Sequence, residues 1–438
     1  MNRNLLKTIR ELIIFASPIA FGQLSQMLIG VGDVFIAAHH SRQTLAAMGI
    51  ANSISAPIFL IGIGLLLGIS PTLSKKRGES LDVSQYFYTC ITYAIIISAV
   101  FMVISMVIAV NLIPYLGFDA SITPLIQEYL FFVSFSYFGA YIFMAIKEYL
   151  QAVEHVVFAN SISVVAVLVN LGVGYMMTFG LWIFPELGIR GLAYTAVLVR
   201  IAMAVTIFIY ARKYNKTTFT VIKHFAKHVF TFSLPISMSI FTEVFAFSVV
   251  MILIGRISPL YAAIHSISLN IASTTYMIPL AIASATSVKI AYFYGRRNFN
   301  KVREFMKSGI LLSMSFMAIA GLILFLFPKT ILGFFTTDIE IIMYGVPIII
   351  VCALFQIFDG AQVTFSGVLR GLGITKPTFI IAVAGYWMVG LPLGYYLGYV
   401  RHMNALGFWI GLAVALFIVS LSLYGYLLTV LKKIKSIQ

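Results

Sequence analysis

Long apolar runs set the strongest limit on what this chain can fold into. Runs of roughly 20 or more mainly apolar residues recur along the whole sequence, and a helix of that length crosses a hydrocarbon core of about 30 Å. Only 10% of the residues are charged and 61% are hydrophobic, whereas about a quarter are charged in soluble domains. The apolar residues follow a helical period and lack the alternation of barrel strands. The sequence therefore predicts an all-α integral membrane protein.

The runs predict twelve transmembrane helices. The first run is too long for a secretory signal peptide and ends without a small-residue cleavage site. Both cysteines, Cys90 and Cys352, fall within predicted spans, so neither a disulfide framework nor a cysteine metal site is indicated. The expected spans are 12–38, 45–73, 86–112, 123–146, 156–181, 188–211, 229–254, 260–288, 306–327, 341–369, 377–399 and 404–430.

Basic side chains are shared unequally between the two sets of loops. The chain carries 29 Lys and Arg against 14 Asp and Glu, a net charge of +15. With the loops assigned to alternate sides, 23 of the 29 basic residues fall on the side of both termini, and Arg200 is left inside a span. By the positive-inside rule both termini are cytoplasmic. The basic excess thus sets topology, and we expect no binding to nucleic acid.

The two halves of the sequence repeat each other. SPIAFGQ, which contains Pro18, aligns with LPISMSI, which contains Pro235, 217 residues later. Gly174 and Gly394 each precede a tyrosine and are 220 residues apart. Because six spans in each half give both halves the same orientation, we expect a pseudo-two-fold axis along the membrane normal. The predicted organisation is an N-terminal six-helix lobe at 1–211, a cytoplasmic linker at 212–228 and a C-terminal six-helix lobe at 229–438.

Three carboxylates lie well inside predicted spans: Asp33, Glu243 and Asp359. A charge at bilayer depth costs at least about 2.5 kcal/mol, so it is kept only with a partner or a function. Apart from Arg200, no span offers an obvious Lys or Arg partner, so an unpaired carboxylate there should be neutral unless a cation arrives. H⁺, Na⁺ or an organic cation would compete for such a group, and their exchange between opposite-facing states is antiport.

Polar residues share a helical face with each acid. Gln23, Gln26 and Gly30 precede Asp33 at helical steps. Any single polar residue of this kind more often holds helices together than serves transport. Polar faces in both halves nevertheless indicate a wet cavity between the lobes. The other faces of this kind contain Ser239 beside Glu243, Gln356 and Gln362 beside Asp359, His265 and Asn270 in the eighth span, and Asn160, Ser163 and Asn170 in the fifth.

These motifs in combination resemble the multidrug and toxic compound extrusion (MATE) transporters of the NorM-like branch. The shared motifs are QLSQ followed by GD, LAAMGIANSISAP and GLLLGISPTLSKKRG in the first half, and LPISMSIFTEVF, AAIHSISLN and FDGAQVTFSGVLRGLG in the second. The resemblance covers roughly residues 10 to 430. It implies two six-helix lobes that form a V around a central cavity, and export of organic cations or drugs against entry of H⁺ or Na⁺. It also implies no enzyme activity, no cofactor, a bacterial inner membrane, lipid as the surrounding partner and a sufficient monomer.

The resemblance also carries roles to matching positions. Asp33 matches the acid of the first helix, and Pro18 matches the proline at which that helix bends. Glu243 and Asp359 match the pair of acids in the C-terminal lobe, where Na⁺ is a possible ligand. The candidate coupling or substrate-binding residues are these three acids, Asn170 and Thr195 as partners of the first acid, His265 and Asn270 from the motif "AAHQ" and a following Asn (with Ser266 replacing the Gln), and Gln356.

Two departures from the family pattern bear on the coupling ion. Gly174 stands where the family commonly supplies a carboxylate or amide, and Phe355 stands where some members have a tyrosine. Both changes remove oxygen ligands that a hard cation such as Na⁺ requires. They favour protons slightly, and both ions stay open.

Two other functions are weighed against export. A lipid-linked precursor flippase of a related two-lobe family usually shows a more basic cavity, whereas the intramembrane charges here are mainly acidic. A membrane-embedded enzyme or scaffold is disfavoured because the residues show no metal or nucleophile spacing. Scrambling of a lipid-linked sugar would favour the flippase, and turnover of a substrate without its movement across the membrane would favour the enzyme or scaffold.

Overall fold

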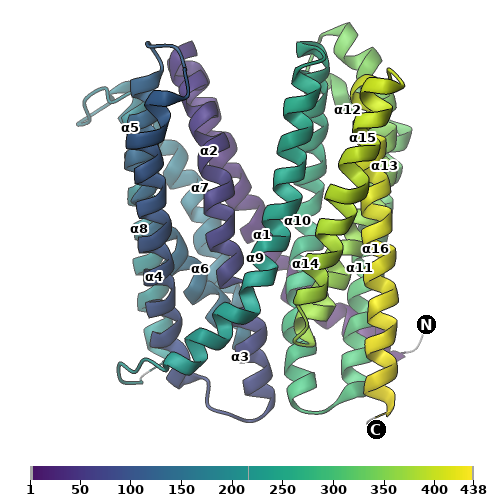
Figure 1. Cartoon of the computed structure of the whole chain (residues 1–438). Coiled ribbons are helices and arrows are strands. Elements are labelled where there is room, and N and C mark those ends of the chain that lie inside the picture. Colours follow the sequence, from purple (N-terminus) through teal and green to yellow (C-terminus); the bar gives the residue numbers. More distant parts are fainter. Residues whose placement is uncertain (1–2, 216, 437–438) are drawn as a thin grey trace. The chain divides into compact units, whose positions relative to one another are not determined.

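A computed structural model describes residues 3–215 and 217–436 of the chain, and its regular elements are helices (Figure 1). Within these residues, twelve helical segments are long and apolar enough to cross a membrane. The predictions of an all-α protein and of twelve spans are therefore confirmed. The first six segments contain α1 (Arg3–His40), α2 (Arg42–Leu66), α3 (Ile69–Gly78), η1 (Ser84–Tyr86), α4 (Phe87–Val107), η2 (Ile108–Leu112), η3 (Ile113–Tyr115), α5 (Thr123–Ser134), α6 (Ser136–Ala152), α7 (Val156–Phe179) and α8 (Ile189–Tyr214).

The second six segments begin at the helix after the central connection. They contain α9 (Lys223–Gly255), α10 (Pro259–Gly295), α11 (Phe299–Leu326), α13 (Ile339–Gly371), α14 (Lys376–Val383), η4 (Ala384–Gly390), α15 (Leu391–Tyr395), η5 (Tyr396–Val400) and α16 (Asn404–Ser436). The short helix α12 (Pro328–Gly333) lies between the segments of α11 and α13. Several segments extend beyond the predicted spans because the helices continue past the apolar run into polar residues, as α10 does.

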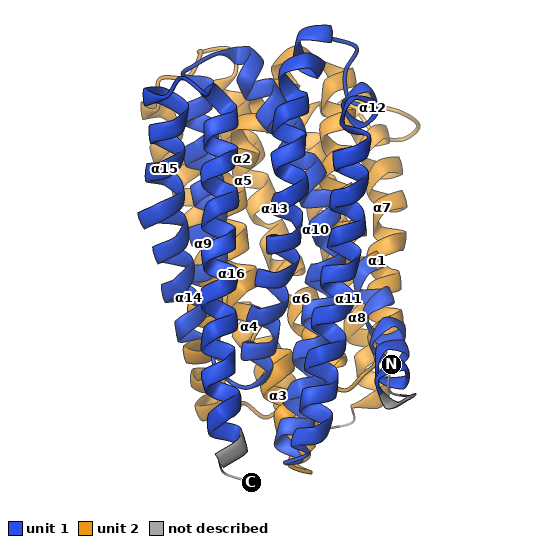
Figure 2. Cartoon of the chain, turned by 90° about the vertical axis from the view of Figure 1, so that its right-hand side faces the viewer, with its two compact units in different colours: residues 1–20, 238–438 blue, residues 21–237 orange. Residues whose placement is uncertain are grey.

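The chain forms two compact units, coloured separately in Figure 2. Unit 1 contains residues 1–20 and 238–438, and unit 2 contains residues 21–237. Helices α10, α11, α13 and α16 pack together in unit 1, and α4, α6, α7 and α8 pack together in unit 2. The predicted lobes divide the chain at other residues. The difference arises because α1 and α9 each begin in one unit and end in the other.

Polar contacts hold the start of α1 to unit 1. The Lys289 ammonium of α10 donates to Oε1 of Glu11 at 3.0 Å, and only 6% of the Lys289 side chain is exposed. The Thr8 hydroxyl donates to Glu304 of α11 at 3.3 Å. Leu12 is fully buried beside these residues in sequence. The first turns of α1 are thus anchored among helices of the second half.

The start of α9 is held to unit 2 in a similar way. The Ser237 hydroxyl donates to the carbonyl of Ile61 at 2.7 Å, and the Phe225 ring lies 4.3 Å from the Tyr86 ring between centroids. Because α9 begins at Lys223, the last part of the predicted linker 212–228 is helical. Lys216, within that linker, lies outside the described residues.

The two halves contain an equivalent close approach of helices. A Cβ added to Gly174 would lie 3.7 Å from Cγ2 of Thr195, and one added to Gly411 would lie 2.6 Å from Cα of Gly394. Gly174 and Gly394 are the repeat-related pair found in the sequence, and Thr195 precedes Gly411 by a similar interval of 216 residues. These contacts support an internal repeat, while its symmetry axis stays a prediction.

Within unit 2, α1 and α7 run parallel and in register. Contacting residues on the two helices differ by 138 or 139 in number, and a constant difference requires parallel axes. Small residues permit the approach: a Cβ on Gly22 would lie 2.1 Å from the side-chain oxygen of Asn160. This register positions the first candidate acid. The contacting pairs are Gly22 with Asn160, Gly32 with Leu171, Ile36 with Gly174 and His40 with Phe179.

Candidate functional site

The acid of unit 2 is buried between α1 and α7. Asp33 is 8% exposed, and the side-chain amide of Asn170 donates to its Oδ1 at 2.7 Å. The register of the two helices explains this pairing, since Asp33 precedes Asn170 by 137 residues. The amide oxygen of Asn170 is buried and has no hydrogen-bond partner among the described residues. A buried carboxylate with one neutral donor can hold a proton or a cation.

Thr195 lies near this acid without a hydrogen bond to it. Its hydroxyl donates within α8 to the carbonyl of Gly191 at 2.8 Å and approaches the Met177 sulfur at 3.5 Å. The side chain packs against Gly174, where a Cβ would also lie 3.2 Å from Ile36. The space beside Gly174, where the family commonly has a polar side chain, is therefore filled by the side chains of Ile36 and Thr195.

The acids of unit 1 lie on α9 and α13. The Gln362 amide donates to Oε2 of Glu243 at 3.2 Å, and the Tyr386 hydroxyl donates to Oε1 of Gln362 at 2.9 Å. Glu243 is half-buried and Asp359 is 4% exposed. Gln362 lies one turn beyond Asp359 on α13, so its bond to Glu243 brings the two carboxylates near each other, with the Tyr276 hydroxyl of α10 in electrostatic range of both. Two neighbouring carboxylates shielded from water bind a shared proton or cation more readily than they ionise together.

Gln356 extends this polar cluster toward α10. Its amide donates to the Thr275 hydroxyl at 2.6 Å, while its Oε1 is buried without a partner among the described residues. Gln356 is fully buried. The unused amide oxygen is one turn of α13 from Asp359, which makes it available to an incoming donor or cation.

The three acids, Asp33, Glu243 and Asp359, form no ion pair with a basic side chain within residues 3–215 and 217–436. The same part of the chain has no cluster of three or more His, Cys, Asp or Glu able to hold a metal ion. The acid pair alone therefore provides the charged oxygens for the possible Na⁺ site predicted at Glu243 and Asp359.

Two candidates from the eighth span stand apart from this cluster in their contacts. His265 is fully buried with its ring 5.7 Å from the Trp409 ring, and neither ring nitrogen has a hydrogen-bond partner among the described residues. Asn270 is exposed and donates to the carbonyl of Ser266 in its own helix at 2.9 Å. Phe355, the second departure from the family pattern, packs 5.6 Å from the Trp409 ring.

Sequence analysis missed the two tyrosines near the acid pair. Tyr386 lies in η4, in a segment whose sequence AGYWMVG shows no polar stripe, and Tyr276 directly follows Thr275 in α10. Neither has a spacing relation to Glu243 or Asp359. Their roles follow only from helix packing.

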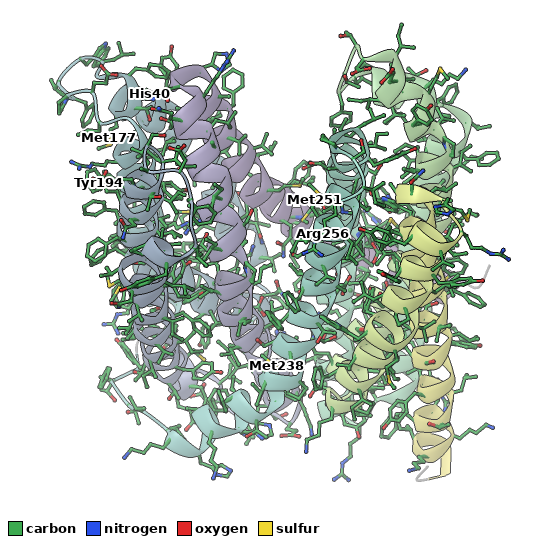
Figure 3. All side chains as sticks on the ribbon, turned by 45° about the horizontal axis from the view of Figure 1, so that its top comes forward. His40, Met177, Tyr194, Met238, Met251 and Arg256 are labelled. Atoms are coloured by element: carbon green, nitrogen blue, oxygen red, sulfur yellow. The ribbon has the colours of Figure 1, made fainter. Side chains whose placement is uncertain are left out.

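A pocket of about 350 Å³ lies at the end of α1 in unit 2. His40 lines it, with Nε2 3.4 Å from the Glu186 carboxylate and Nδ1 2.9 Å from the Thr44 hydroxyl. Arg190 pairs with Glu128 in the same pocket wall. Figure 3 places His40 near the end of unit 2 at which Met177 also lies. The pocket is two helical turns from Asp33 along α1.

Loss of the Asn170 amide should impair transport that depends on Asp33. Asn170→Ala removes a hydrogen bond to a carboxylate, worth about 1.5–3 kcal/mol, so we expect the initial rate to fall about tenfold or more. Asn160→Ala is the matched control, because the Asn160 amide donates only within α7, to Val156 at 2.7 Å. Dye export from everted vesicles measures both. Equal rates in the two variants would contradict the role of Asn170.

Twelve membrane-crossing helices with acids buried in two compact units define an integral membrane transporter. The MatE family model matches residues 18–176 and 235–396. The chain therefore belongs to the MatE family. It is a MATE transporter of the NorM-like branch and, as a member of that family, is not an enzyme.

Relatives and solved structures agree with this assignment. The chain is 28% identical to a probable multidrug resistance protein NorM of Photorhabdus laumondii, over 95% of both chains. It is 26% identical to the multidrug resistance protein MdtK of the same organism, over 94% of this chain and 93% of that one. A eukaryotic MATE transporter, AtDTX14, matches with a TM-score of 0.88 at 20% identity over 97% and 96% of the chains. The bent form of Vibrio cholerae VcmN matches at 0.87, with 16% identity over 99% of each.

Proposed function

We propose that the chain is a cation-coupled antiporter that exports organic cations, drugs or toxic compounds by alternating access, driven by H⁺ or Na⁺. The observation that carries this proposal is that Gln362 of α13, one turn beyond Asp359, donates to Glu243 at 3.2 Å, which brings the two acids together without an ion pair to a basic side chain among the described residues. Such a pair requires a proton or a cation. Entry of the coupling ion then competes with the organic cation for the same oxygens.

The names of the relatives support the substrate class. NorM and MdtK are both described as multidrug resistance proteins. The fold by itself does not decide the substrate, since a MOP superfamily transporter from Pyrococcus furiosus has the same fold, with a TM-score of 0.84, and is described as having a binding pocket of reverse polarity that suggests a different function. In this chain the acids supply the polarity expected for cationic substrates.

The first helix of each half is the proposed moving part. Pro18 lies two residues before the position at which α1 passes from unit 1 to unit 2, and Pro235 lies just before the equivalent position in α9. A proline inside a helix removes one backbone hydrogen bond and permits a kink. We propose that bending at Pro18 accompanies binding at Asp33, with the remaining candidates, Thr195, His265 and Asn270, lining or supporting the substrate path.

The loop charges support the proposed membrane orientation. With both termini cytoplasmic, 23 of the 29 basic residues face the cytoplasm of a bacterial inner membrane. Labelling of single cysteines in these loops by an impermeant reagent tests the orientation. One chain contains all the candidate residues, so a monomer is sufficient.

Proteoliposomes containing the purified protein test the proposed function. An imposed pH gradient, an imposed Na⁺ gradient, or both should drive a fluorescent organic cation across the membrane in exchange for the ion. Asp33→Asn should slow this movement. Separate imposition of the gradients identifies the ion. If neither gradient moves the dye although the protein is folded, the proposal fails, and transfer of a fluorescent lipid-linked sugar becomes the measurement for the flippase alternative.

A further inference from the structure

The candidate site does not use Arg200 of α8, a cation that lies well inside a predicted span. Its Nη1 donates to the buried Ser136 hydroxyl of α6 at 2.6 Å, and its guanidinium lies 4.9 Å from the centroid of the Phe59 ring of α2. The residue is half-buried and makes no ion pair within the part of the chain that the structure describes. An arginine stays charged at every relevant pH. Its charge is therefore a permanent feature of the interior of unit 2.

Helix register places this charge at the depth of the unit 2 acid. Helices α7 and α8 are antiparallel, because Gly174 packs against Thr195 while Met177 packs against Gly191. Five residues beyond Thr195, Arg200 lies opposite the turn of α7 that contains Asn170. Asn170 in turn bonds Asp33 at 2.7 Å. The acid and the guanidinium thus occupy one level of the bundle.

The electrostatic surroundings agree with this placement. The charged and titratable groups that face Asp33 are Arg200 of α8 and Tyr129 of α5, and α7 contributes only the Asn170 amide, which does not titrate. The charges of Asp33 and Arg200 both act on the Tyr129 hydroxyl. This hydroxyl points to α2 and lies 3.5 Å from the side-chain oxygen of Asn52. On α7, the turn that follows Asn170 brings Gly174 rather than a carboxylate toward this level.

We propose that Arg200 is the fixed counter-charge of Asp33 and makes the acid of unit 2 selective for protons over Na⁺. When Asp33 loses its proton, the guanidinium already supplies the positive charge that stabilises the carboxylate. A Na⁺ ion at this place would be repelled by Arg200 and would find few oxygen ligands. No ion pair joins the acid pair of unit 1 to a basic side chain among the described residues, so any Na⁺ binding belongs there. This inference rests on the proposed coupling role of Asp33.

Infrared titration of the protonated carboxyl group tests the proposal directly. The parent protein for this experiment carries Glu243→Gln and Asp359→Asn, so that the acid pair of unit 1 gives no carboxyl band. The band of Asp33 is assigned by its loss when Asp33→Asn is added. In Arg200→Gln the band of protonated Asp33 should disappear at a pH about one unit or more higher than in the parent, because a positive charge that stabilises the carboxylate is removed. Arg200→Lys keeps the charge and Ser136→Ala removes only its hydrogen bond, so both should titrate like the parent. Replacement of K⁺ by Na⁺ should leave the parent band unchanged.

Two results would overturn the proposal: identical titrations of Arg200→Gln and the parent, or loss of the Asp33 band when Na⁺ replaces K⁺. The second result is measured on the parent alone, so it tests the proposal even if Arg200→Gln does not fold. The measurement does not depend on export. A folded protein that titrates as expected but moves no dye would refute the proposed function and leave the role of Arg200 intact.

Discussion

Glu243→Gln and Asp359→Asn are each expected to reduce gradient-driven export to the level of protein-free liposomes. Each variant keeps the shape of the side chain and removes one of the two acids of the pair that is proposed to exchange a proton or Na⁺ for an organic cation. The variant also removes the repulsion between two acids in an apolar setting, so folding should be unimpaired. Export of a fluorescent cation, together with protein yield and elution profile in detergent, separates the two effects.

Glu340→Gln provides the matched control for this result. Glu340 lies on the same helix, α13, but in its exposed first turn. The same change of charge there should leave export at the parent rate. Full activity in both Glu243→Gln and Asp359→Asn would show that the acid pair does not couple transport, and the proposed mechanism would have to be abandoned.

Gly411→Leu is expected to prevent correct assembly of unit 1. A Cβ at this position of α16 would lie 2.6 Å from the carbonyl oxygen of Gly390 and 2.6 Å from backbone atoms of Gly394. Those contacts are backbone atoms, which cannot rotate away as a flexible side chain would, so the cost should be at least about 3 kcal/mol, the upper end for an overpacked core. Yield of monodisperse protein and the thermal unfolding midpoint measure the loss.

Gly425→Leu tests whether the effect belongs to the close helix approach. Gly425 is in the same helix, and a Cβ there would meet nothing within 4 Å. Its variant should be produced like the parent, with an unfolding midpoint within a few degrees. If Gly411→Leu assembled equally well, the contact of α16 with η4 and α15 would not be as tight as the structure shows.

The sequence alone determined the class of fold and most of the acidic cluster in unit 1. A membrane helix satisfies its backbone hydrogen bonds within its own residues, so long apolar runs are enough to predict the spans. Gln356, Asp359 and Gln362 were also predictable, because they share one face of a single helix and helical spacing is a local property. Asp33 and Glu243 were found as carboxylates that apolar surroundings make costly.

Only the tertiary structure decided which of these residues meet. The exchange of the first turns of α1 and α9 between units depends on contacts such as Glu11 with Lys289, 278 residues apart, which no local pattern encodes. The same holds for Tyr386 beside Gln362, for Arg200 at the level of Asp33, and for the burial of His265 against Trp409. In a lipid-like surrounding the apolar surface of a helix does not select its neighbour. The choice rests on close packing of small residues and on interhelical hydrogen bonds, and these exist only once the helices are assembled.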